Sequence, residues 1–127
     1  MKTLFSFLTI AVLVLTSSFT VANQQEANVN KAFSCFNYLR VHRQGKNDVA
    51  INWAVNSPQI SMFIVERSYD GDFFDNVSTV AANGASVYRQ QDKDIYPGVI
   101  NYRVVAVYNN GSTECSPVES IRIVQRK

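Results

Sequence analysis

Apolar and polar residues alternate with a period of two along most of the chain from residue 34 onward. The clearest stretch, DVAINWAV at 48–55, places Val49, Ile51 and Trp53 on one face and smaller or polar residues on the other. This alternation predicts a β-strand with one face in a hydrophobic core. The longest candidate is INYRVVAVY at 100–108. Its inward positions are expected to be Tyr102, Val104 and Ala106.

Turn-forming residues separate these stretches at regular intervals. Asp70-Gly71, Asn83-Gly84 and Asn109-Asn110-Gly111 are the clearest, because Gly and Asn tolerate the positive φ of tight hairpins. No apolar pattern of period 3.6 persists after residue 22. Seven short strands in about 95 residues predict an all-β, antiparallel β-sandwich. The first strand is expected to place four residues on one face: Cys35, Asn37, Leu39 and Val41.

The first 22 residues have a different composition. A lone Lys2 precedes an apolar run from Leu4 to Leu15, which is too short for the roughly 20 residues of a membrane span. We expect a signal peptide at 1–22 cleaved after Ala22, with an uncleaved anchor as the alternative. A polar lead at 23–33 and one domain at 34–127 would follow. The chain is therefore expected to be secreted, periplasmic or at the cell surface.

The balance of charged residues limits the classes of partner that we expect. Removing residues 1–22 takes away one of twelve Lys and Arg residues and none of the ten Asp and Glu residues. The remaining Lys and Arg residues are nearly balanced by Asp and Glu residues. We therefore expect no excess of positive charge that would bind nucleic acid or a membrane surface. No metal-ligand spacing and no glycine-rich phosphate loop occurs, so no metal and no cofactor is predicted.

The two cysteines have two interpretations. In an exported chain, an even number of cysteines predicts a disulfide, here Cys35–Cys115. Two buried free thiols are the alternative.

Four stretches carry a resemblance to a known family. VAINWAV, FIVERSYDGDFF, INYRVVAVYNNGS and SPVESIRIV resemble strands of a fibronectin type III domain, an immunoglobulin-like β-sandwich, of the divergent kind found in bacterial secreted and surface proteins. The resemblance covers roughly 34–124. It implies that Trp53 is the core tryptophan and that Tyr102 is the tyrosine corner, with a hydroxyl that caps backbone near 95–97. It also places Cys35 and Cys115 at the same end of the sandwich, where a disulfide would clamp the terminal strands.

The sequence contains an acid-rich stretch, RSYDGDFFDNVS at 67–78, of a kind that can form calcium loops or catalytic carboxylate pairs. A calcium loop starting at Asp70 fails because Phe74 and Ala81 occupy ligand positions. We therefore expect a hairpin turn at Asp70-Gly71, with Phe73 or Phe74 entering the core. The only histidine, His42, lies seven residues from Cys35 on one extended strand, which excludes a Cys–His pair between them.

The remaining candidates are polar loops that this fold places at one end. They contain groups suited to adaptable hydrogen bonds, although polar loops are also ordinary solvated surface. The candidate binding residues are Asn56, Ser57, Gln59, Asn109, Asn110, Ser112 and Thr113. We expect a non-catalytic binding module for an extracellular or envelope protein or a glycan, with self-association through an edge strand as a further possibility. A secreted enzyme inhibitor or a purely structural envelope component are the alternatives.

Overall fold

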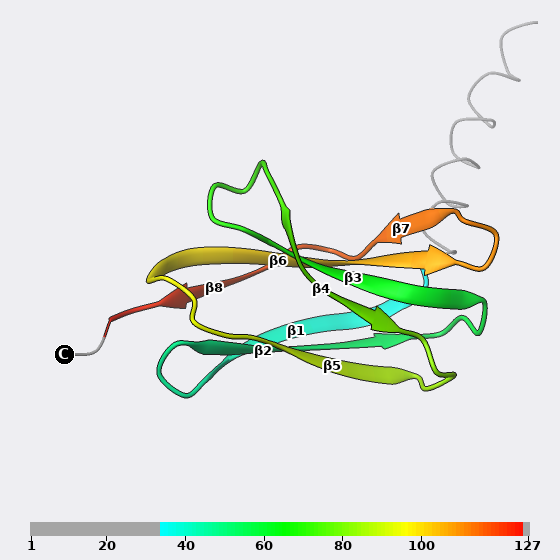
Figure 1. The fold of residues 1–127 in the computed structure, drawn as a ribbon, viewed down its shortest axis with the longest axis horizontal. Helices are drawn as coiled ribbons and strands as arrows, with labels where there is room; N and C mark the ends of the chain where they lie inside the picture. Colours follow the sequence, from blue (N-terminus) through cyan, green and yellow to red (C-terminus); the bar gives the residue numbers. More distant parts are fainter. Residues whose placement is uncertain (1–33, 126–127) are drawn as a thin grey trace, which may run out of the picture. The chain divides into compact units, whose positions relative to one another are not determined.

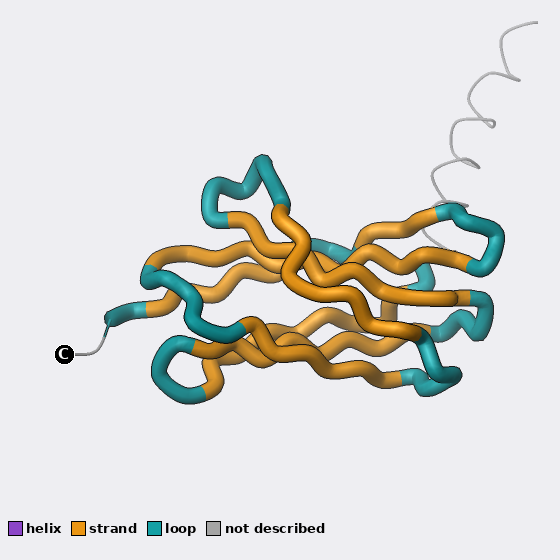
Figure 2. Tube along the Cα trace, in the orientation of Figure 1, coloured by secondary structure: helices purple, strands orange, loops and turns teal. Residues whose placement is uncertain are grey.

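The computed structural model describes residues 34–125, so the predictions for 1–22 and 23–33 lie outside the described residues. Strands and loops make up the described chain (Figures 1 and 2). The strands are β1 (Phe36–Gln44), β2 (Asp48–Val55), β3 (Ile60–Ser68), β4 (Asp75–Ala81), β5 (Val87–Asp92), β6 (Gly98–Tyr108), β7 (Thr113–Cys115) and β8 (Glu119–Ile123). Within 34–125, no helix is long and apolar enough to cross a membrane.

Two antiparallel sheets pack face to face (Figure 1). One has the order β1-β2-β5, and the other has the order β4-β3-β6-β7, with β8 also paired to β6. All strand pairs are antiparallel. The predicted all-β, immunoglobulin-like sandwich is therefore confirmed as a fold class.

The described chain forms eight strands rather than the expected seven. The last predicted segment is divided at 116–118, where Pro117 has no N–H for a ladder. Ser116 occupies the break and bonds Val104 twice: its N–H donates to the Val104 carbonyl (2.8 Å), and its Oγ accepts from the Val104 N–H (2.9 Å). Both halves consequently stay on β6.

The core lies between the inner faces of the sheets, at the positions that the alternation predicts. Trp53 and Tyr102 are both fully buried. The Trp53 ring stacks on Tyr88, with centroids 5.8 Å apart, and meets Phe63 edge-on at 5.4 Å. Aromatic pairs of this geometry stabilise a core beyond the burial of their area.

The prediction that Asn37 shares one face of the first strand with Cys35, Leu39 and Val41 is wrong for Asn37. A bulge between Phe36 and Tyr38 adds an unpaired residue, Asn37, to β1. The bulge shifts the alternation, so Phe36 and Leu39 are both buried while Asn37 is exposed.

Candidate binding surface

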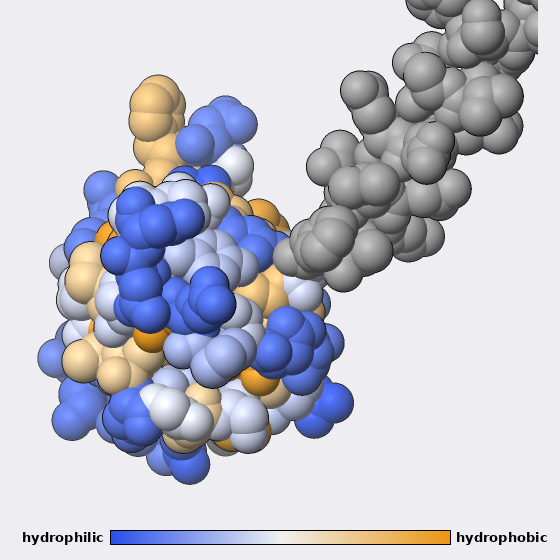
Figure 3. All heavy atoms as spheres, turned by 90° about the vertical axis from the view of Figure 1, so that its right-hand side faces the viewer, coloured by the Kyte–Doolittle hydropathy of each residue, from blue (hydrophilic) through white to orange (hydrophobic). Residues whose placement is uncertain are grey.

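Two polar connections meet at one end of the sandwich, between β2 and β3 and between β6 and β7 (Figure 1). The Asn109 N–H donates to the Gln59 carbonyl (2.8 Å) and joins the two connections. Beside this bond lies an open hollow of about 490 Å³. Its lining residues are Gln59, Tyr108, Asn109, Asn110 and Ser112. Figure 3 shows this end of the domain, where hydrophilic surface predominates.

Three of the predicted binding residues do not line the hollow. The Asn56 side chain donates from Nδ2 to Asn37 Oδ1 (3.0 Å), across to the first strand. Ser57 Oγ accepts from the Gln59 N–H (3.3 Å) and shapes the β2–β3 connection. Thr113 is the first residue of β7 and pairs with Val107. The structure thus brings Gln59, Asn109, Asn110 and Ser112 together at the hollow and places these three apart from it.

The β6–β7 turn is held by its own hydrogen bonds. The Tyr108 N–H donates to the Ser112 carbonyl (2.8 Å), and the Gly111 N–H donates to the Tyr108 carbonyl (2.9 Å). Asn110 Oδ1 accepts from both the N–H and the Oγ of Ser112, at 2.9 and 2.7 Å. Gly111 adopts a φ of 88°, which the turn requires. The β6–β7 side of the hollow is therefore a turn whose conformation is fixed by hydrogen bonds.

The sequence pattern did not indicate Tyr108 and Glu114 as site residues. The Tyr108 hydroxyl donates to Glu114 Oε2 (2.6 Å), and Glu114 Oε1 accepts from the Cys35 N–H (3.1 Å). Burial, followed by hydrogen bonding to neighbouring groups, raises the pKa of Tyr108 above its ordinary value. Tyr108 therefore stays protonated and acts as a hydrogen-bond donor behind the hollow. Its position at the end of a long strand, just before a turn, was the available signal.

The predicted disulfide is not formed in this structure. Cys35 is a buried free thiol (2 % exposed), whereas Cys115 is a free and exposed thiol. The reason is the alternation along β7: Glu114 reaches Cys35, so the next residue, Cys115, points to the other face of the sheet. Burial also raises the pKa of the Cys35 thiol to about 11.

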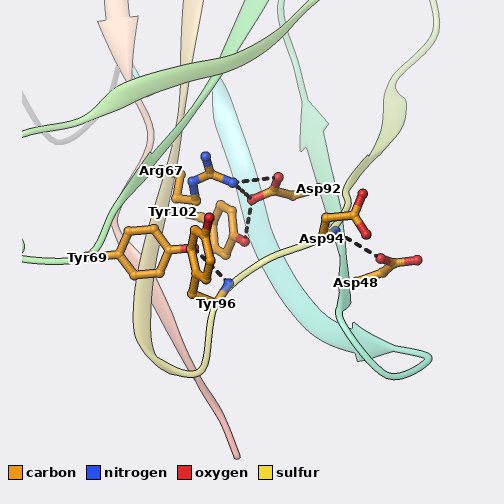
Figure 4. Close-up of polar contacts among 7 residues, drawn as sticks. All are labelled: Asp48, Arg67, Tyr69, Asp92, Asp94, Tyr96 and Tyr102. Carbon is orange, nitrogen blue, oxygen red and sulfur yellow. Dashed lines mark hydrogen bonds and ion pairs between the residues drawn. The ribbon is translucent and has the colours of Figure 1, made fainter. Parts of the chain in front are cut away.

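A buried polar cluster links the two sheets (Figure 4). Asp92 on β5 is 4 % exposed and accepts from Arg67 Nη1, at 2.8 Å to both carboxylate oxygens. It also accepts from the Tyr102 hydroxyl (2.7 Å). Burial, followed by the hydrogen bond to Asp92, raises the pKa of Tyr102. The cluster is an ion pair with a protonated phenol, in which the Asp92 carboxylate is hydrogen-bonded from the opposite sheet while Arg67 Nε is buried without a hydrogen-bond partner.

This cluster corrects the expected tyrosine corner. The Tyr102 hydroxyl donates to a side-chain carboxylate, not to backbone near 95–97. The 93–97 connection is instead held by other partners. The Ile95 N–H donates to the Asn47 carbonyl (2.9 Å), and the Tyr96 N–H donates to the Tyr69 hydroxyl (3.2 Å).

The surface over this cluster is aromatic and acidic (Figure 4). The rings of Tyr69 and Tyr96 lie 6.4 Å apart, and Tyr96 is 74 % exposed. Arg67 lies over the Tyr69 ring, with its Cζ 5.6 Å from the centroid. Asp94 adopts a φ of 57°, and its N–H donates to Asp48 Oδ1 (3.3 Å). These contacts hold the β5–β6 connection against Tyr69, just beyond the end of β3, and against Asp48, the first residue of β2.

The acid-rich stretch forms the predicted turn. Asp70 Oδ1 accepts from the Asp72 N–H (2.8 Å), the Phe73 N–H (2.9 Å) and Ser68 Oγ (2.9 Å). These bonds, with the Phe73 and Asp72 amides first, lower the pKa of Asp70. Gly71 has a φ of 85°, as the reversal requires. The Asp70 carboxylate is thus committed to its own turn.

The expectation that Phe73 or Phe74 enters the core is wrong. Phe73 is 79 % exposed, and Phe74 lies beneath the guanidinium of Arg103, 4.0 Å from Cζ to the ring centroid. The reason is the bulge in β4, where Val77 is an extra residue that packs against the core. An extra residue reverses the alternation of side chains before it, so Phe74 lies on the outer face of the sheet.

His42 lies exposed on β1, whereas Cys35 is buried at the start of the domain. Among residues 34–125, no three His, Cys, Asp or Glu side chains gather in a way that could hold a metal ion.

Comparison with known proteins gives fold likeness alone. No protein-family model matches the sequence, and no curated protein matches it significantly. Solved structures do match. One is pectate lyase PelI from Erwinia chrysanthemi in complex with tetragalacturonic acid, at 16 % identity and a TM-score of 0.55, with 65 % of this chain and 27 % of that chain covered. This chain thus spans about a quarter of the lyase. A myokine structure matches at 14 % identity and a TM-score of 0.55, with 73 % of this chain and 98 % of that chain covered.

Proposed function

We propose that this chain is a fibronectin type III-like domain that is exported and works as a non-catalytic binding module. Its partner is a protein or a glycan in the extracellular space or the cell envelope. The sheet order supports the family. Strands 1, 2 and 5 form one sheet, and strands 4, 3, 6 and the divided last segment form the other. The buried tryptophan on β2 and the buried position of Tyr102 on β6 support the same assignment, whereas the Tyr102 hydroxyl departs from it by donating to Asp92 and not to backbone.

The observation that carries the binding role is the hollow between the β2–β3 and β6–β7 connections. It is open, and amide and hydroxyl side chains surround it on a rigid turn. Preorganised polar groups lose little conformational entropy on binding. Amides and hydroxyls, with one tyrosine, are also the groups that exchange hydrogen bonds with sugar hydroxyls or with a peptide backbone. The hollow therefore suits an uncharged polar ligand.

Binding assays on the purified protein test this proposal. A panel of oligosaccharides and an extract of envelope proteins would be screened, and any ligand found would be measured by calorimetry. We expect Gln59→Ala and Asn109→Ala each to weaken binding by about tenfold, because each removes hydrogen-bonding groups at the rim.

The matched control is Arg89→Ala, an exposed change on β5 in the other sheet, which is expected to leave affinity unchanged. Equal affinity of the Gln59 and Asn109 variants with the unaltered protein would move the site away from the hollow. Binding that is weakened by Arg89→Ala alone would also place the site away from the hollow.

An enzyme inhibitor is the second candidate, and the same turn favours it. The 109–112 turn projects from the end of β6, and its hydrogen bonds hold its conformation fixed. Rigid protruding loops of this kind insert into enzyme clefts with little change on binding. Inhibition of a secreted hydrolase, lost on Asn110→Ala, would select this alternative over the binding module.

A further inference from the structure

Four strand groups lie at sheet edges: β1 and β5 in one sheet, and β4 and the β7–β8 segment in the other. Exposed edges invite pairing with other chains, and proteins protect them with charges, prolines, bulges or short strands. β1 has a bulge at Asn37, and its Arg43 Nη1 donates to the Val124 carbonyl (3.1 Å). β5 carries exposed Arg89 near its centre. β7 has three residues and is followed by Pro117.

β4 is the edge that lacks most of this protection. From Asn76 to Ala81 it contains no charged residue, no proline and no glycine. Asp75 at its first position and the bulge at Val77 lie toward the start of the strand. The second half, Ser78–Ala81, pairs with β3 in regular register and has no such feature.

The register of β3 and β4 shows which backbone groups face the open side. The Ala82 N–H donates to the Ser61 carbonyl (3.0 Å), directly in line with the ladder. Because the direction of backbone groups alternates along a strand, Ser78 and Val80 face β3. The N–H and C=O of Thr79 and Ala81 therefore face away from β3, where no strand of residues 34–125 pairs. Both residues are exposed.

We infer that β4 pairs with β4 of a second copy of this chain, antiparallel, about a two-fold axis near Thr79. In this register Thr79 lies opposite its own copy, and Asp75 at the start of one β4 lies beyond Ala81, the last residue of the other β4. The two Asp75 carboxylates are then far apart, whereas a parallel arrangement would bring them together. The same pairing at β5 would oppose Arg89 to Arg89, and like charges directly opposite destabilise a strand pair. Charge therefore favours β4 over β5 for self-pairing.

The outer face of the sheet agrees with this arrangement. Two rows of uncharged side chains run from β4 across the sheet. One row contains Thr79, Ile64, Val105 and Cys115, and the other contains Ala81, Met62, Val107 and Thr113. A continuous sheet of two copies thus buries no charge on these rows. Strand pairing alone buries less than the roughly 800 Å² per partner of a stable interface, so the dimer depends on concentration.

Sedimentation equilibrium of the purified protein, from about 10 μM to about 1 mM, tests this inference. We expect a monomer–dimer equilibrium, weakened about tenfold or more by Thr79→Pro. Proline is tolerated where the N–H faces outward from an edge, so the domain itself should keep its fold. Arg89→Pro is the matched control: its N–H faces the open side of β5 by the same reasoning, since the Val55 N–H bonds the Ser86 carbonyl (2.9 Å).

Hydrogen exchange gives a second, residue-level measurement. The amides of Thr79 and Ala81 should gain protection as concentration rises, while the amide of Arg89 should not. A monomer throughout the concentration range, or a dimer weakened equally by both proline changes, overturns the inference. If Thr79→Pro unfolds the domain, Thr79→Lys replaces it, since a lysine at the edge repels its own copy.

Two further results are informative. Capture of an extended segment of another protein at β4, with the chain itself monomeric, overturns the second copy as the occupant. If Gln59→Ala abolishes ligand binding and leaves the dimer unchanged, the β4 edge and the hollow are separate surfaces. Each proposal can therefore fail without the other.

Discussion

Asp92 connects the two sheets by polar contacts that cross the hydrophobic core. It lies on β5, and its partners Arg67 and Tyr102 lie on β3 and β6 of the opposite sheet. A buried carboxylate with an ion-pair partner and a hydroxyl donor is well satisfied, and removal of either donor leaves part of its desolvation uncompensated. The sequence placed Tyr102 in the core but gave no sign of Asp92, because the partners are distant in the chain.

Tyr102→Phe is predicted to lower the free energy of unfolding by about 1.5–3 kcal/mol, the range for a hydrogen bond to a charged group. The ring still fills its place in the core, so the loss reports the hydroxyl. Urea unfolding followed by Trp53 fluorescence measures it. Tyr96→Phe, at a ring that is 74 % exposed, is the control and should change stability little. Equal stability of Tyr102→Phe and the unaltered protein would contradict the prediction.

The Cys35 thiol predicts a stability loss at high pH. Its pKa is raised from 9.0 to about 11 in the folded protein, so the folded state holds the proton more tightly than the unfolded state. The resulting stabilisation is fully present below pH 9 and disappears as the pH rises toward 11. The loss is on the order of 2–3 kcal/mol. Denaturant unfolding at pH 8 and pH 10.5 should show a smaller loss in Cys35→Ala, and an identical loss in both proteins would refute the assignment.

Alternation within single strands decides what each element exposes. On β2 and β6 the period-two pattern predicted the buried face, because the extra residues in their ladders lie on the partner strands β1 and β3 and leave the alternation of β2 and β6 unbroken. On β1 and β4 one bulge each shifted the alternation and sent Asn37 outward and Val77 inward. On β7 a single step separates Glu114 from Cys115 and keeps the two thiols on opposite faces.

Thiol labelling tests this separation. In the folded protein, Cys115 is predicted to react with a disulfide reagent within minutes, whereas Cys35 should react only after denaturation. Mass spectrometry with and without reduction should show no internal disulfide. Cys115→Ser is the control and should abolish the fast phase alone. Equally fast labelling of both thiols, or no fast labelling of either, would contradict the burial of Cys35 and the exposure of Cys115.

At the scale of the whole molecule, two sheets enclose one core and leave polar connections at the ends (Figure 1). The same arrangement leaves a hollow at one end and the unprotected edge of β4 along one side. Export of the chain is a separate expectation, since it depends on residues 1–22.

Export predicts a defined start for the mature protein. The chain isolated from the periplasm or the medium of expressing cells should begin at Asn23, as N-terminal sequencing would show. Ala22→Pro should block the cut and leave a heavier, membrane-associated form, while a change outside the site, such as Gln25→Ala, should have no effect. An intact Met1 on the exported protein would favour the anchor.

Period-two alternation and turn residues were enough to predict the sandwich, the burial of Trp53 and Tyr102, and the reversal at Asp70-Gly71. These features follow from local chemistry: which side chains avoid water, and which residues tolerate positive φ. The Asp92 cluster, the bulges, the free thiols and the hollow depend on residues brought together across sheets and turns. A side-chain period of two cannot indicate a bulge before it occurs, and one added residue reverses every face beyond it. Only the tertiary structure decided those.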